Sequence, residues 1–170
     1  MTLDDIAFEL TPEQISESKI LVVDDEEIIT STLASFLFVE LDAEAVTFNE
    51  PEKAVAWLQR NDVDLVISDF LMPGLDGIKL LAAARAIHPH SPRILLTGYA
   101  DKENAIKAIN EVGLYQYIEK PWSNEDLRII LRNGVEKKQL LEKLRQKMSE
   151  VTRAYDELLG IQKEVLKAFV

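Results

Sequence analysis

The sequence predicts an α/β fold: a doubly wound sheet of five parallel strands with five helices, followed by one extended C-terminal helix. Two patterns carry this prediction. Short, continuous apolar runs such as Ile20–Val23 and Leu65–Ile67 are typical of strands that are buried on both faces. Segments with the apolar spacing of helices lie between these runs, and such an alternation implies right-handed crossovers in a parallel sheet.

Each element can be placed in order along the chain. The expected strands are 20–23, 45–48, 65–67, 93–96 and 114–118. The first three expected helices are 26–41, a helix that begins at Pro51, and a helix that begins at Asp76 and Gly77 and carries Leu80, Leu81 and Ala84. The last two are 102–112 and a helix that is capped by Ser123 or Asn124. Residues 1–18 form an N-terminal extension, in which Thr11–Gln14 has the pattern of a helix start. This extension is either a short packed helix or a loose leader.

Residues 137–170 have the pattern of a coiled coil. Eight of nine positions at alternating spacings of three and four are apolar, and the nine are Leu141, Leu144, Met148, Val151, Tyr155, Leu158, Gln162, Val165 and Phe169. Gly160 falls on the outward side. Because exposed apolar positions on a lone helix are unfavourable, we expect a parallel homodimer through residues 137–169. Leu159, Ile161 and Leu166 widen the stripe, which suggests a bundle or burial against a further element.

Composition excludes several classes of protein. The 30 acidic and 19 basic residues give a net charge of −11, which opposes binding to phosphate backbones or anionic lipid, so no direct nucleic-acid partner is expected. The absence of cysteine excludes disulfides and thiolate metal sites. No apolar run has the roughly 20 residues of a spanning helix, and the acidic start differs from a secretory signal. We therefore expect a cytoplasmic location without membrane insertion.

The residues that carry chemistry lie where the expected strands end. Asp24, Asp25, Asp69, Thr97 and Lys120 all occupy such positions, and parallel strands end at one edge of a sheet. Clustered carboxylates raise one another's pKa unless a cation lies among them, and hard oxygen ligands suit Mg²⁺. With the charge neutralised, one aspartate could attack phosphorus and form an acyl phosphate, while the lysine and the metal stabilise charge on the phosphoryl oxygens.

Residues 19–136 resemble the receiver domain of two-component response regulators, which has a flavodoxin-like sheet. The resemblance rests on four stretches that occur in the order expected of the family, and these are Ile20–Glu26, Asp69–Gly77, Leu95–Gly98 and Tyr117–Pro121. It implies a response regulator of a two-component phosphorelay that is not an enzyme beyond slow self-phosphorylation and self-dephosphorylation. Residues 1–18 and 137–170 lie outside the family pattern.

The resemblance assigns a role to each residue of the expected site. Asp69 corresponds to the phosphoacceptor, which takes a phosphoryl group from a histidine kinase or a phosphotransfer protein. Asp25, Asp69 and the backbone carbonyl of Leu71 correspond to direct Mg²⁺ ligands, and Asp24 to an acid that acts through water. Lys120 corresponds to the lysine that contacts the acceptor.

The resemblance also implies a conformational switch. Thr97 and Tyr117 correspond to a switch pair, in which the hydroxyl moves towards the phosphoryl group and the ring follows inward. This movement biases an interaction surface beside the last strand and thereby the helical output. The peptide bond before Pro121 is typically cis in the family.

The same residues would also be compatible with other functions, which the sequence disfavours. An aspartyl-nucleophile phosphatase of the haloacid-dehalogenase type needs an acid two residues after the nucleophile, where this chain has Leu71. A flavodoxin-type FMN site lacks its phosphate loop, because the acidic run Asp24–Glu27 would repel the phosphate. Asp24 and Asp25 could simply cap a helix. His88 and His90 are expected to be solvated loop residues.

The sequence is compatible with two kinds of output from the receiver. The C-terminal helix either ends the protein as a dimerising coiled coil or leads to an effector of a larger regulator. By analogy, candidate effectors are a cyclic-di-GMP enzyme, a protein phosphatase, a hybrid histidine kinase and an AAA+ activator.

Overall fold

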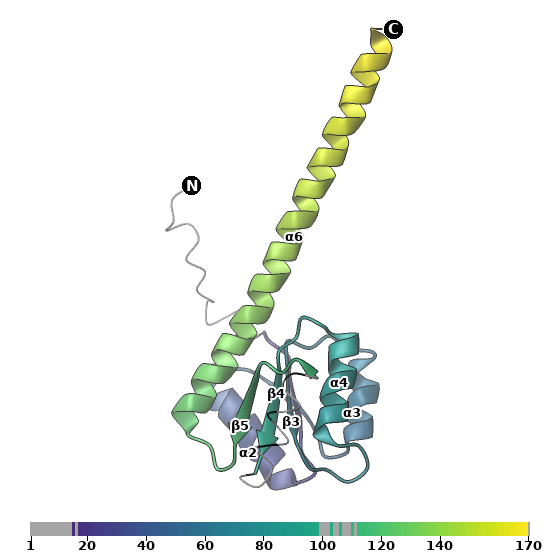
Figure 1. Cartoon of the computed structure of the whole chain (residues 1–170). Coiled ribbons are helices and arrows are strands. Elements are labelled where there is room, and N and C mark those ends of the chain that lie inside the picture. Colours follow the sequence, from purple (N-terminus) through teal and green to yellow (C-terminus); the bar gives the residue numbers. More distant parts are fainter. Residues whose placement is uncertain are drawn as a thin grey trace. The chain divides into compact units, whose positions relative to one another are not determined.

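The computed structural model describes residues 15, 17–98, 103, 106, 110 and 112–169. It contains a five-stranded parallel sheet with the strand order β2-β1-β3-β4-β5, which confirms the predicted doubly wound fold (Figure 1). The strands are β1 (Ile20–Val23), β2 (Ala45–Phe48), β3 (Leu65–Asp69), β4 (Arg93–Thr97) and β5 (Gln116–Glu119). The strand predicted at 114–118 thus begins two residues later than expected.

Four helices are complete in the described part of the chain. They are α2 (Glu27–Leu41), α3 (Pro51–Leu58), α4 (Gly77–Ile87) and α6 (Asn124–Ala168). The helix predicted over 102–112 and the helix start predicted at Thr11–Gln14 fall largely outside the described residues. Two predicted helix starts are confirmed: the Asp76 carboxylate accepts the Lys79 N–H at 2.9 Å, and the Ser123 hydroxyl accepts the Asp126 N–H at 3.4 Å.

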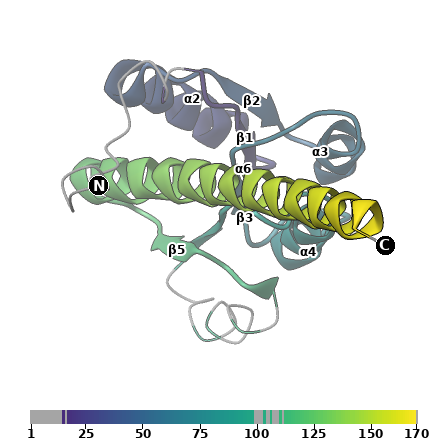
Figure 2. The same ribbon diagram turned by 90° about the horizontal axis from the view of Figure 1, so that it is seen from above.

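Helices lie on both faces of the sheet (Figures 1 and 2), and the core forms two layers, one on each face. Alternate side chains of β1 point to opposite faces, as the pleat requires. Ile20 and Val22 pack with α2 and residues 127–135 of α6, whereas Leu21 and Val23 pack with α3 and α4. Ile15, which precedes β1, is buried in the first of these layers.

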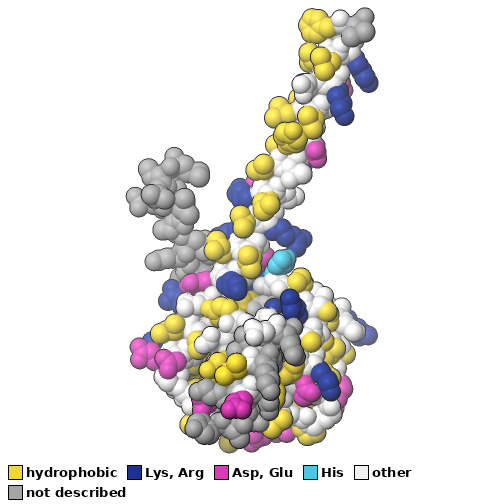
Figure 3. Space-filling model, in the orientation of Figure 1, with side chains coloured by type: hydrophobic (Ala, Val, Ile, Leu, Met, Phe, Trp, Pro, Cys, Tyr) yellow, Lys and Arg dark blue, Asp and Glu magenta, His cyan; other side chains and the backbone are white. Residues whose placement is uncertain are grey.

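Helix α6 has 45 residues, and the chain divides into two compact units, residues 1–138 and 139–170. In the second unit the predicted apolar stripe is exposed, as the hydrophobic side chains along this part of α6 in Figure 3 show. The exposed large hydrophobic residues there are Leu140, Leu144, Met148, Val151, Tyr155, Leu158, Leu159, Ile161, Val165, Leu166 and Phe169. Among the helices in the described part of the chain, none has the length and apolar character needed to cross a membrane.

Candidate functional site

The parallel strands bring their carboxyl ends to one edge of the sheet. Asp24 directly follows β1, Asp69 and Thr97 end β3 and β4, and Lys120 directly follows β5. The register places Asp69 opposite Leu96 and Thr97 opposite Glu119, so the strands end at nearly the same level. Four side chains that are distant in the sequence therefore lie together.

Three carboxylates form a cluster at this edge. Asp24, Asp25 and Asp69 each offer an oxygen, and these oxygens lie within 4.8 Å of one another. Asp24 is fully buried and Asp69 is nearly so, whereas Asp25 is exposed. The cluster thus opens to solvent on the side of Asp25.

Lys120 bridges the two buried carboxylates. Its Nζ lies 2.9 Å from Asp24 Oδ2 and 2.9 Å from Asp69 Oδ1. The other Asp24 oxygen accepts the N–H of Glu26 at 2.9 Å. Asp24 therefore uses both oxygens in hydrogen bonds, and a single ammonium connects the ends of β1, β3 and β5.

The electrostatics of the pair follow from burial and from these contacts. Burial raises the pKa of the Asp69 carboxyl above its ordinary value, and the charge of Asp24 adds to this, although the hydrogen bond from Lys120 opposes it. Burial alone would lower the pKa of Lys120, but its hydrogen bonds to Asp69 and Asp24 outweigh this effect and raise it. Lys120 thus stays charged, while the Asp69 carboxylate is held in an unfavourable environment.

Gly77 sets how closely α4 approaches the site. Its N–H donates to the carbonyl of Phe70 at 2.9 Å, and a Cβ built on it would lie only 1.9 Å from the carbonyl oxygen of Asp69. Only glycine allows this contact between main chains. The sequence pattern indicated a helix start here but not the reason for a glycine.

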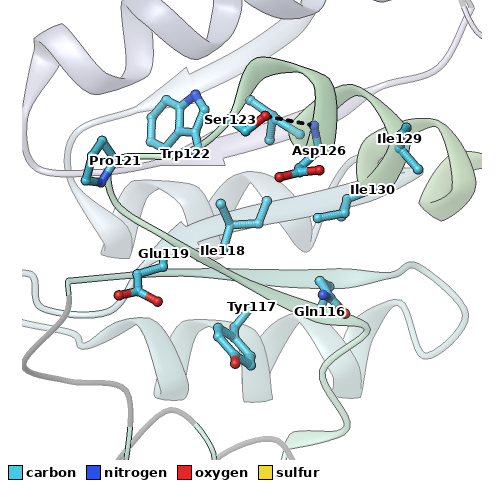
Figure 4. Close-up of a pocket in the computed structure, with 11 residues that line it drawn as sticks. Gln116, Tyr117, Ile118, Glu119, Pro121, Trp122, Ser123, Asp126, Ile129 and Ile130 are labelled. Atoms are coloured by element: carbon cyan, nitrogen blue, oxygen red, sulfur yellow. Dashed lines mark hydrogen bonds between the residues drawn. The ribbon is translucent and has the colours of Figure 1, made fainter.

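Thr97 and Tyr117 lie on neighbouring strands. Thr97 is fully buried, and its hydroxyl donates to the carbonyl of Gly98 at 3.0 Å. Tyr117 pairs with Leu95 and packs on the α3 and α4 face of the sheet, opposite to Ile118 (Figure 4). By the alternation along β4, Thr97 points to the same face as Leu95.

The loops after β3 and β5 complete the site. The side chain of Leu71 is 60% exposed, and the peptide bond between Lys120 and Pro121 is cis. Ile29, Lys120, Pro121 and Trp122 line a cavity of about 400 Å³ beside the acidic cluster. Sequence reasoning did not single out this cavity, because it depends on how α2 and the loop after β5 meet.

Two further side chains differ from what sequence reasoning offered. Asn49 was missed: its side-chain amide donates to the carbonyl of Asp24 at 2.8 Å and lies 3.2 Å from the hydroxyl of Thr30, so it fixes the end of β1. His88 and His90 lie in the loop after α4, as predicted, and His90 is exposed, but His88 is less solvated than expected. Its Nε2 lies 2.9 Å from the carbonyl of Leu58, and the ring is half-buried because it bridges the ends of α4 and α3.

Comparison with known proteins places this geometry in a family. Over 120 residues the chain is 38% identical to the hydrogenase transcriptional regulatory protein HoxA of Cupriavidus necator. This alignment covers 71% of this chain and 24% of that protein. It is 35% identical over 124 residues to a putative NtrX-like response regulator of Rickettsia felis, covering 72% of this chain and 26% of that protein. The chain thus spans about a quarter of the length of these curated relatives.

Solved structures agree with the sequence relatives. A response regulator receiver domain from Clostridium thermocellum matches with a TM-score of 0.68 and 36% identity, covering 73% of this chain and 98% of that one. NtrX from Brucella abortus in complex with ADP matches with a TM-score of 0.69 and 32% identity, covering 75% of this chain and 29% of that one. The model of the response regulator receiver domain matches residues 20–132. The chain therefore belongs to the response regulator receiver domain family.

Proposed function

We propose that Asp69 accepts a phosphoryl group from a histidine kinase or a phosphotransfer protein in a Mg²⁺-dependent reaction, as the receiver of a two-component response regulator. The observation that carries this proposal is the acidic cluster of Asp24, Asp25 and Asp69 with Lys120 bonded to two of its members. On this proposal the receiver is a phosphoacceptor and not an enzyme with a separate substrate, and it acts in the cytoplasm.

The donor set fits a divalent cation. Three carboxylates and one ammonium leave two negative charges, which a single divalent cation balances. Oxygen ligands on an open edge suit Mg²⁺, which binds through one or two carboxylates and keeps several waters. Asp24, Asp25, Asp69 and the backbone carbonyl of Leu71 are the groups proposed to hold it. When bound, Mg²⁺ would supply charge neutralisation for the carboxylates and the phosphoryl oxygens.

The side chains of the chain divide the remaining work. An Asp69 carboxylate oxygen forms the bond to phosphorus, and the bond from phosphorus to the donor's nitrogen breaks. Lys120 holds the Asp69 carboxylate before transfer and is close enough to contact a phosphoryl oxygen afterwards. The hydroxyl of Thr97 turns from Gly98 to the phosphoryl group, and Tyr117 follows it. A cavity of about 460 Å³ beside Tyr117, lined by β5 and the first turns of α6, lies on the surface that this movement changes (Figure 4).

Mass spectrometry of the intact protein tests the proposal. With acetyl phosphate and Mg²⁺, the native chain should gain the mass of one phosphate, and D69N should gain none. D62N is the matched control, because Asp62 is an exposed aspartate in a loop away from the cluster, and it should gain the same mass as the native chain. No gain in the native chain, or an equal gain in D69N, would overturn the proposal. Turnover of a small phosphate ester would favour the aspartyl-nucleophile phosphatase instead.

The C-terminal helix supports a second part of the proposal, a parallel homodimer through residues 137–169. Its apolar stripe is more than a third exposed at every large hydrophobic position from Leu144 to Phe169, and pairing with a second copy would bury it. Because the relatives are several times longer and include named transcriptional regulators, we further propose that this receiver controls an effector of a larger regulator. Among the candidate effectors, these names favour an activator of transcription.

A further inference from the structure

Residues 134–138 of α6 pack against the amino ends of the strands, opposite to the acidic cluster. Lys138 is buried there, with 10% of its side chain exposed, and its Nζ lies 3.8 Å from Asp64 Oδ1. Asp64 is itself fixed, because its other oxygen accepts the N–H of Lys19 at 2.8 Å and its own N–H donates to the carbonyl of Lys19 at 2.8 Å. The last buried residue of α6 is thus tied to the starts of β1 and β3.

Two further contacts hold the same turn of the helix. A Cβ built on Gly134 would lie 2.6 Å from Leu65 Cδ1 and 3.4 Å from Tyr115 Cε1, so α6 packs closely on these two side chains, and a larger residue here would require Leu65 to shift. The Nζ of Lys137 lies 5.2 Å from the centre of the Tyr115 ring. Tyr115 is fixed in turn, because its N–H donates to the carbonyl of Arg93 at 2.9 Å.

These contacts and the acidic cluster occupy the two ends of the same strands. Asp64 directly precedes β3, and Asp69 ends it; Tyr115 directly precedes β5, and Lys120 directly follows it. The ion pair of 2.9 Å between Lys120 and Asp69 connects the strands at the carboxyl end. A shift of β5 relative to β3 at the carboxyl end should therefore also displace Tyr115 and Asp64 at the opposite end of these strands.

We propose that five residues at this end of the strands pass the phosphorylation state of Asp69 to residues 139–169, because they set the rotation of α6 about its own axis. These residues, here called the exit clamp, are Asp64, Tyr115, Gly134, Lys137 and Lys138. The inference rests on the proposed function, since it requires that phosphorylation disturbs the pair of Lys120 and Asp69. Positions three and four residues apart lie on one side of a helix, so contacts at 134, 137 and 138 resist rotation. From residue 135 to 159 the helix contains neither glycine nor proline, so its sequence has none of the usual kink sites between these contacts and Gly160.

Hydrogen–deuterium exchange of the full chain tests this inference. Exchange in peptides from 139–169 is compared with and without Mg²⁺ and beryllofluoride, a mimic of the phosphoryl group. G134A crowds the end of the Leu65 side chain and so disturbs the packing of α6 on the sheet, and K138M keeps the apolar stem but removes the charge that Asp64 binds. The matched controls are G160A, whose Cβ would meet nothing within 4 Å, and K147M, which removes an exposed lysine paired with Glu150 at 2.9 Å.

The native chain and both controls should show a change of about threefold or more in tail exchange on activation. G134A and K138M should lose most of this change while they gain phosphate from acetyl phosphate at a rate within about twofold of the native chain. A tail response of native size in both clamp variants, or no tail response in a native chain that is phosphorylated, would overturn the inference. Failure of the native chain to gain phosphate would instead overturn the proposed function, so the two failures are distinguishable. If G134A does not fold, K138M alone decides the outcome.

Discussion

Replacing Gly77 by alanine should damage both the stability of the receiver and its site. The added Cβ would lie 1.9 Å from the Asp69 carbonyl oxygen, 2.9 Å from its carbonyl carbon and 3.1 Å from Phe70 Cα, all main-chain atoms. Since real Cβ contacts below 3.0 Å essentially do not occur, α4 and the end of β3 must separate by about 1 Å or more. No flexible side chain is available to absorb this movement.

The magnitude follows from two contributions. Overpacking of this kind destabilises by about 1–3 kcal/mol. Loss of the 2.9 Å hydrogen bond from Gly77 N–H to the Phe70 carbonyl adds about 1 kcal/mol. For a domain of this size, each kcal/mol lowers the melting temperature by about 3–4 °C, so G77A should melt about 6–16 °C below the native chain.

Thermal unfolding followed by circular dichroism measures the first effect, and the rate of mass gain from acetyl phosphate measures the second. A displacement of about 1 Å at the acceptor should slow phosphorylation by about 10- to 100-fold. G160A is the matched control, because the same change there meets no atom within 4 Å and improves helix propensity. A melting temperature of G77A within 2 °C of native, with an unchanged rate of phosphorylation, would refute the close approach of α4 to Asp69.

Two further predictions concern charge and assembly. Because burial raises the pKa of Asp69, its ionised form disfavours folding above that pKa; without Mg²⁺, D69N should therefore melt above the native chain near pH 7, with a difference that shrinks as the pH falls through the raised pKa and is gone below about 4. A lower or equal melting temperature of D69N at pH 7 would contradict this. Light scattering should give a dimer for the native chain and a folded monomer for the double variant L144K/V151K, whereas Q146K/S149K, altered on the polar side, should stay dimeric. A double variant that remains dimeric would exclude the proposed seam.

The fold and the centre of the site could be predicted because they follow from periodicity and from sheet geometry. Runs such as Ile20–Val23 are buried on both faces only in a parallel sheet, and parallel strands end at one edge. Asp24, Asp69 and Lys120 each adjoin a strand end, so their convergence required no knowledge of loop conformation. The apolar stripe of the C-terminal helix was predictable for the same reason, since it depends on helical spacing alone.

Contacts that depend on loops or on main-chain partners could not be predicted. Asn49 reaches the carbonyl of Asp24 across 25 positions of sequence, and no pattern marks such a bond. Arg93 is buried, yet its guanidinium donates to the carbonyls of Ser91 and Gly113 and to no carboxylate in the described part of the chain. The bridge from His88 to Leu58 joins the ends of two helices whose separation only the folded chain defines.

The central claim is that Asp69 is the residue that carries the phosphoryl group. After incubation with acetyl phosphate and Mg²⁺, reduction with borohydride converts an aspartyl phosphate to homoserine, and peptide mass spectrometry locates the converted residue. The account predicts homoserine at position 69 alone, and none when acetyl phosphate or Mg²⁺ is left out. Conversion at Asp24 or Asp25, or protein that gains phosphate without conversion at position 69, would contradict it.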